Sequence, residues 1–117
     1  MSERVTKRLH DALDACESIQ LFLGDTTLSE YEANFGLQLQ IERLLEIIGE
    51  ALRQASHVEP GIRQDIPDLG EIIGLRNKLI HGYDGIDEEI VWTAAAVRTE
   101  ELKMLLKELL DNRPGIA

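Results

Sequence analysis

The segment RNKLIHGY, residues 76–83, contains four side chains whose types and spacing are suited to chemistry on a phosphate ester: Arg76, Asn77, His81 and Tyr83. Histidine exchanges a proton near neutral pH, and arginine offers a planar fork of donors to phosphate oxygens. Two interpretations are open. The segment is either a ribonuclease site or a capped helix end, in which His81 complements the helix dipole and Gly82 provides a left-handed cap.

The segment lies at the end of a predicted helix, and helical periodicity extends over almost the whole chain. Apolar residues recur at three- and four-residue steps from Val5 to Leu23, and Gly24 is expected to end this first helix. A second amphipathic helix is predicted from about Leu28 to Ala55, before Pro60 and Gly61 break the pattern.

Two further helices are predicted on either side of the motif. Asp65 is expected to be the N-cap of a third helix, with Pro67 in its first turn, and this helix ends near His81. Asp87 is expected to cap a last helical stretch through Leu109, interrupted near Thr99. No strand pattern is present, so the predicted fold is all-α: an antiparallel up-and-down bundle of four to five helices in a single domain, residues 1–117, frayed from about residue 112.

Composition restricts the classes of function. The chain has 22 acidic and 12 basic residues, for a formal charge of -10, so it repels nucleic acid except where basic groups are concentrated. The single Cys16 excludes an internal disulfide, and no Cys and His residues have the spacing of a zinc site, which fits a reducing cytosol. No segment resembles a signal peptide or a membrane span, which predicts a cytoplasmic protein without a membrane partner.

The third predicted helix has two different faces. An apolar arc, expected to pack into the bundle, contains Leu69, Ile72, Leu75, Leu79 and Ile80, with Ile73 at its edge. A second stripe contains Gly70, Gly74, Asn77 and His81. Because each interior glycine costs roughly 1 kcal/mol relative to alanine, we expect another backbone to approach this stripe. If that backbone is the same helix of a second copy, the protein is a homodimer through Gly70, Gly74 and Asn77, and both copies of His81 meet.

The motif and its flanks resemble the HepT-like toxins of the HEPN superfamily. The signature of that family is an arginine followed by a polar residue, three further positions, a histidine, any residue and a tyrosine, which Arg76, Asn77, His81 and Tyr83 match. The segments LEIIGEA, residues 45–51, and DEEIVW, residues 87–92, are similar to the flanking segments of the family. The resemblance therefore covers most of the chain.

This resemblance implies a HEPN-like, metal-independent ribonuclease with no cofactor, an RNA substrate and no DNA partner. His81 would be the general base or acid, Arg76 would bind the phosphate, and Asn77 would orient it. The products would be a 2',3'-cyclic phosphate and a 5'-hydroxyl. The resemblance also implies a minimal nucleotidyltransferase antitoxin, which silences the toxin by transferring AMP from ATP onto Tyr83.

Alternatives remain open for each residue and for the function. Arg76 projects from the apolar arc, so a structural ion pair with Glu50 or Asp84 is also consistent with the sequence. Asn77 is equally explained as a surface polar group, and Tyr83 as a packed aromatic residue. A rival function is a noncatalytic HEPN module that binds a nucleotidyltransferase, and a third is a structural bundle with neither role.

Overall fold

The computed structural model describes residues 3–82 and 85–112, and begins with a long helix that matches the sequence prediction. Helix α1 spans Glu3–Leu23. It ends at Gly24, whose φ of 50° lies in the left-handed region that glycine adopts without steric cost. The predicted fraying beyond residue 112 falls outside the described residues.

The predicted second helix is wrong in one respect, because it consists of two helices, α2 (Leu28–Glu32) and α3 (Phe35–Val58). Local caps cause the break. The side chain of Asn34 accepts a hydrogen bond from the Leu37 amide at 3.0 Å, which starts α3 anew. Helical periodicity alone does not reveal this break, which is why a single helix was predicted.

The predicted start of the third helix is also wrong. Asp65 does not cap it, because Asp65 is the last residue of a short helix, α4 (Ile62–Asp65). The motif helix, α5 (Leu69–His81), begins after Asp68, and the Asp68 side chain makes no capping hydrogen bond. That carboxylate instead forms an ion pair with Arg98 at 2.8 Å. The Asp68 side chain thus pairs with Arg98, which is distant in the sequence, rather than with a backbone amide of α5.

The last helical stretch confirms both the predicted cap and the predicted interruption. Asp87 accepts a hydrogen bond from the Glu89 amide at 2.9 Å and starts α6 (Glu88–Thr93). A π-helical segment, η1 (Ala94–Arg98), separates α6 from α7 (Thr99–Asp111). The π-helical segment ends one residue before Thr99, near which the sequence predicted the interruption. The Thr99 hydroxyl donates to the Ala95 carbonyl at 2.6 Å.

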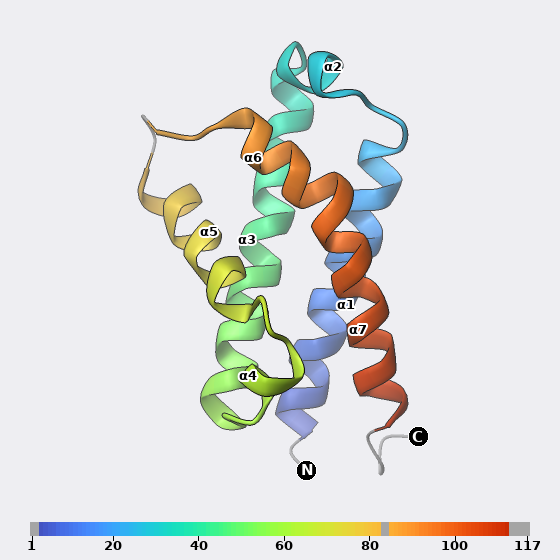
Figure 1. The fold of residues 1–117 in the computed structure, drawn as a ribbon, viewed down its shortest axis with the longest axis vertical. Helices are drawn as coiled ribbons and strands as arrows, with labels where there is room; N and C mark the ends of the chain where they lie inside the picture. The colour runs from blue at the N-terminus through green and yellow to red at the C-terminus, as the bar shows by residue number, and fades with distance from the viewer. Residues whose placement is uncertain (1–2, 83–84, 113–117) are drawn as a thin grey trace.

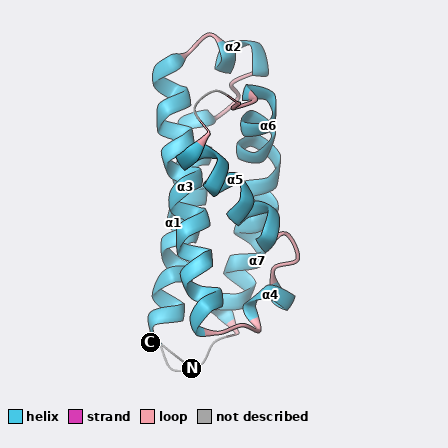
Figure 2. Ribbon diagram, turned by 90° about the vertical axis from the view of Figure 1, so that its left-hand side faces the viewer, coloured by secondary structure: helices cyan, strands magenta, loops and turns pink. Residues whose placement is uncertain are grey.

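The helices form an all-α antiparallel bundle, as predicted (Figures 1 and 2). Helix α1 packs against α3 and α7, while α5 lies on the other side of α3 and crosses it (Figure 1). The core between them includes Val5, Leu9, Ile19, Ile41, Ile48, Leu52, Leu69, Leu79, Leu102 and Leu106. Helix α5 is therefore positioned mainly by α3, and its outer face is left open. Across residues 3–82 and 85–112, no helix has the length and apolarity needed to cross a bilayer.

Candidate functional site

The outer face of α5 carries the small-residue stripe, and the chain leaves it uncovered. Gly70, Asn77 and His81 are exposed and Gly74 is half-buried. A Cβ added at Gly70 or at Gly74 would meet no atom within 4 Å. The opposite face packs as predicted, with Leu69 and Leu79 buried. The two glycines therefore serve no packing contact among the described residues of this chain.

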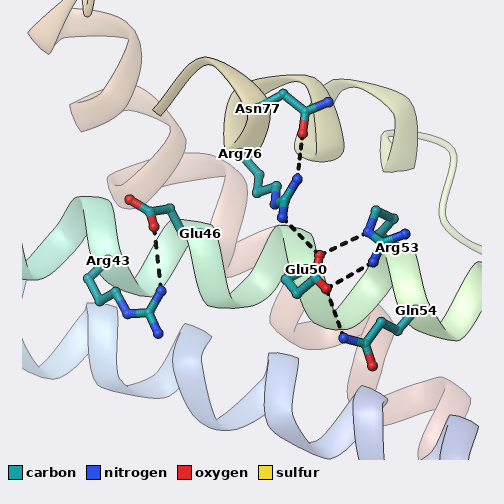
Figure 3. Close-up of polar contacts among 7 residues, drawn as sticks. All are labelled: Arg43, Glu46, Glu50, Arg53, Gln54, Arg76 and Asn77. Carbon is teal, nitrogen blue, oxygen red and sulfur yellow. Dashed lines mark hydrogen bonds and ion pairs between the residues drawn. The ribbon is translucent and has the colours of Figure 1, made fainter. Parts of the chain in front are cut away.

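Arg76 lies on the face of α5 that packs against α3 and is largely buried, with 22% of its side chain exposed. Its Nη2 forms an ion pair with Oε1 of Glu50 on α3 at 3.1 Å, and its Nη1 donates to Oδ1 of Asn77 at 2.8 Å (Figure 3). Its Nε is buried without a hydrogen-bond partner. The ion pair with Glu50 was one of the two that the sequence left open, and the other candidate partner, Asp84, lies outside the described residues.

Glu50 is itself held by two neighbours on α3. Arg53 donates from Nε to Oε1 at 2.9 Å and from Nη2 to Oε2 at 3.0 Å, and Gln54 donates to Oε2 at 2.8 Å (Figure 3). These bonds from Arg53 and Gln54, with a further contribution from the Arg76 charge, lower the pKa of Glu50 to about 2. Glu50 is therefore a fixed carboxylate that stays ionised at neutral pH.

Gly49 is the residue that sequence reasoning missed. A Cβ at Gly49 would lie 2.4 Å from Cβ of Arg76, 2.9 Å from its Cγ and 3.3 Å from the Ile72 carbonyl oxygen. The close approach of α5 to another helix thus occurs here, at α3, rather than at Gly70 or Gly74. The signal was a glycine in the interior of a long amphipathic helix, within LEIIGEA.

His81 is the last residue of α5 and is exposed. The following Gly82 has a φ of -114°, so the left-handed cap considered from the sequence is wrong. Glycine is required there for another reason, because a Cβ would lie 2.8 Å from the Lys78 carbonyl oxygen, to which the Gly82 amide donates at 2.7 Å. In the described part of the chain, no hydrogen bond links His81 to Arg76 or Asn77. The structure thus joins Arg76 to Asn77 and leaves the imidazole open to solvent.

A groove of about 440 Å³ runs beside Arg76 between α1, α3 and α5. Its lining includes three arginines, Arg8, Arg43 and Arg76, and four carboxylates, Asp11, Asp14, Glu46 and Glu50. Each arginine forms an ion pair with one of these carboxylates, at 3.1, 3.4 and 3.1 Å respectively. The groove is therefore not a cationic channel, because each of its arginines is paired with a carboxylate.

Two further expectations concern a metal and Tyr83. Within residues 3–82 and 85–112, no group of three or more His, Cys, Asp or Glu side chains is arranged to hold a metal ion. Tyr83, the predicted AMP acceptor, lies outside the described residues.

A family model and several related proteins that match this chain are all described as ribonucleases. The family model described as "Ribonuclease HepT-like" matches residues 12–109. A candidate RNase of Methanocaldococcus jannaschii is 34% identical over 112 residues, which are 93% of this chain and 97% of the relative. A second candidate RNase of that organism is 32% identical over 89% of each chain. The protein named probable ribonuclease HepT of Thermococcus cleftensis is 30% identical over 86% of this chain and 91% of its own. No solved structure matches significantly.

Proposed function

Because this chain belongs to the HepT-like ribonuclease family, we propose that it is a metal-independent endoribonuclease that acts as the toxin of a toxin–antitoxin pair. The observation that carries the proposal is the hydrogen bond between Arg76 and Asn77 at the open face of α5, on the helix that also carries His81. A largely buried guanidinium with one accessible edge, on the same helix as an exposed imidazole, is suited to phosphate chemistry.

The proposed reaction uses the 2'-hydroxyl of the RNA as the nucleophile. An imidazole of His81 accepts the 2'-hydroxyl proton while the 2' oxygen attacks phosphorus and the bond from phosphorus to the 5' oxygen breaks. A protonated imidazole or water supplies the proton of the leaving 5'-hydroxyl, and the other product is a 2',3'-cyclic phosphate. Arg76 stabilises the charge on the nonbridging oxygens, and Asn77 orients the phosphate.

A homodimer explains how Arg76 and His81 can contact the same phosphate. Arg76 and His81 are separated by ~140° around a straight helix, so a single α5 directs them apart. In the proposed dimer, the stripe of Gly70, Gly74 and Asn77 packs against its symmetry mate, which brings both copies of His81 towards one cleft. The open space above Gly70 and Gly74 supports this arrangement.

The proposed partner is a minimal nucleotidyltransferase antitoxin that modifies Tyr83. The phenol oxygen attacks the α-phosphorus of ATP, pyrophosphate leaves, and the phenol proton passes to solvent, which leaves an AMP group on Tyr83. The added negative charge and bulk, two residues after His81, would repel RNA and occupy Arg76.

The proposal is tested by incubating the purified protein with RNA in the presence of a chelator and mapping the cleavage ends. We expect 2',3'-cyclic phosphate and 5'-hydroxyl ends, and a rate ~10²- to 10⁴-fold lower for His81→Ala. His57→Ala is the matched control, because His57 is also exposed but lies near the end of α3. Cleavage that persists in His81→Ala, or that requires magnesium, contradicts the mechanism.

A second candidate function is a noncatalytic module that binds a nucleotidyltransferase. The charge of -10 and the groove beside Arg76, which has one more carboxylate than arginines, favour it, because neither attracts RNA. Expression of this chain alone discriminates between the two. Growth arrest that is lost in His81→Ala supports the enzyme, whereas binding of the nucleotidyltransferase without growth arrest supports the module.

A further inference from the structure

Two consecutive residues of α3, Gly49 and Glu50, contact the side chain of Arg76, and we call them the Arg76 socket. Gly49 faces the stem, since its missing Cβ leaves space that Cβ and Cγ of Arg76 approach. Glu50 binds the head, with Oε1 at 3.1 Å from Nη2. The ion pair therefore joins two different helices at a mostly buried position.

The carboxylate of this socket does not depend on Arg76 for its own position. Both of its oxygens accept hydrogen bonds from Arg53, and one also accepts from Gln54, all within one turn of α3 (Figure 3). These contacts restrict the rotamers of Glu50 on the surface of α3. Glu50 is thus a preorganised acceptor on a rigid helix, which is the arrangement that a precise supporting contact requires.

The ion pair of Arg43 shows how the Arg76 socket differs from an ordinary surface contact. Arg43 and Glu46 are three residues apart on the same helix, 3.4 Å from each other, and 70% of the Arg43 side chain is exposed. Such a pair contributes little and leaves the arginine free to move. Arg76 is 22% exposed, and its charge is compensated from a second helix.

We propose that Glu50 is a positioning residue, which holds Nη2 of Arg76 so that Nη1 faces Asn77 and the open side of α5. This inference rests on the proposed ribonuclease function for its consequence in catalysis. On RNA binding, a phosphate oxygen replaces Oδ1 of Asn77 at Nη1, while the contact between Nη2 and Glu50 is retained. Glu50 then acts through Arg76, without touching the substrate.

The first test measures the position of Arg76 without reference to activity. The Nε–H group of Arg76 is buried and has no acceptor, so its side-chain signal in an arginine-edited ¹⁵N spectrum reports how firmly the guanidinium is held. In Glu50→Gln we expect its hydrogen exchange to accelerate roughly tenfold or more, because the charge-assisted contact is lost. Glu46→Gln is the matched control, with the same charge change one turn away on α3, and we expect no acceleration. Unchanged exchange in Glu50→Gln overturns the proposal.

The second test measures cleavage of the RNA used above. We expect Glu50→Gln to lower kcat by about 10- to 100-fold with a smaller change in KM, since a misplaced group costs rate more than affinity. Glu46→Gln is expected to retain the activity of the unmodified chain. In an Arg76→Ala background, Glu50→Gln is expected to add no further loss, because both residues act as one unit. An equal loss of kcat from Glu50→Gln in the unmodified chain and in the Arg76→Ala background overturns the proposal. Faster cleavage by Glu50→Gln also overturns it, because it would show that Glu50 competes with phosphate for Arg76.

A second variant, Arg53→Ala, tests the same proposal in case Glu50→Gln does not fold. Arg53→Ala removes two hydrogen bonds to Glu50 from a side chain that is 47% exposed, so the helix tolerates the change. We expect the same effects on Arg76 exchange and on kcat, at smaller size. If the unmodified chain does not cleave RNA, the ribonuclease proposal fails, and the exchange of the Arg76 Nε–H group still decides whether Glu50 positions Arg76.

Discussion

Gly49 and Arg76 are in such close contact that a methyl group on Gly49 would lie 2.4 Å from Cβ of Arg76. Contacts this short do not occur between real carbon atoms, so α5 could not keep its present crossing of α3 with any larger residue there. The position of α5, and with it the position of the Arg76 guanidinium, therefore depends on having glycine at residue 49.

Gly49→Ala is therefore expected to destabilise the protein. A contact of 2.4 Å places the cost of overpacking towards the upper end of the usual range of about 1–3 kcal/mol, above the roughly 1 kcal/mol that alanine gains over glycine inside a helix. Gly36→Ala is the control, because a Cβ at that exposed helical site meets only Oδ1 of Asn34, at 3.7 Å. Denaturant unfolding measures both variants. A Gly49→Ala variant as stable as Gly36→Ala would show that the helices separate at no cost.

Arg76→Lys is expected to recover little activity. A lysine ammonium has no planar fork, so it cannot bind Glu50 with one arm and present the other to a phosphate in a defined plane. We expect a rate at least about tenfold below that of the unmodified chain, with helical content and oligomeric state unchanged. The check is a comparison of cleavage rates at equal, saturating RNA concentration. Full activity in Arg76→Lys would mean that only the charge matters.

Gly74→Leu is expected to dissociate the proposed dimer. A Cβ at this position has no neighbour within 4 Å in the described part of the chain, so we expect the Gly74→Leu protomer to stay folded, with the helical content of the unmodified chain in circular dichroism. Sedimentation at micromolar concentration should show a dimer for the unmodified chain and a monomer for Gly74→Leu. Gly36→Leu is the control, since it adds the same side chain on another helix. A monomeric unmodified chain at that concentration refutes the composite site.

Glu88 is expected to make stability depend on pH in the mildly acidic range. Its pKa is raised above the ordinary value of 4.5, chiefly by burial and then by the negative charges of Glu32 and Asp87, and one of its oxygens is buried without a partner. The folded state therefore holds the proton more tightly than the unfolded state, so stability falls as pH rises from about 4.5 through the raised pKa. Glu88→Gln should be more stable than the unmodified chain at pH 7 and should lose less stability over this range. Thermal unfolding from pH 4 to pH 7 measures the difference, and parallel curves for the two proteins would exclude Glu88 as the cause.

Tyr83→Phe is expected to retain ribonuclease activity but to escape silencing by the proposed nucleotidyltransferase. A phenylalanine ring has no oxygen to attack ATP, while Arg76 and His81 are unchanged. The measurement is mass spectrometry of the peptide that contains residue 83 after coexpression with the nucleotidyltransferase. Neutralised toxicity without an AMP adduct on the unmodified chain would show that the partner acts by binding alone.

The sequence by itself determined the features that depend on neighbours within a turn or two. The helical period predicted the long helices, Gly24 the end of α1, and Asp87 the start of α6, because each of these interactions is made within one or two turns of the same segment. The spacing of Arg76, Asn77 and His81 on one helix is local in the same sense. The errors at Asn34 and Asp65 arose because helical periodicity reveals neither the Asn34 cap nor the long-range ion pair of Asp68 with Arg98.

Only the tertiary structure decided what each face of the motif helix meets. From the sequence, only Gly70 and Gly74 were expected to allow a close approach, whereas the crossing of α3 and α5 places the close approach at Gly49. The same crossing selected Glu50 as the partner of Arg76 and so oriented its second nitrogen towards Asn77. Residues far apart in the chain come together only through the packing of whole helices, and that packing reflects the sum of many apolar contacts that no single motif encodes.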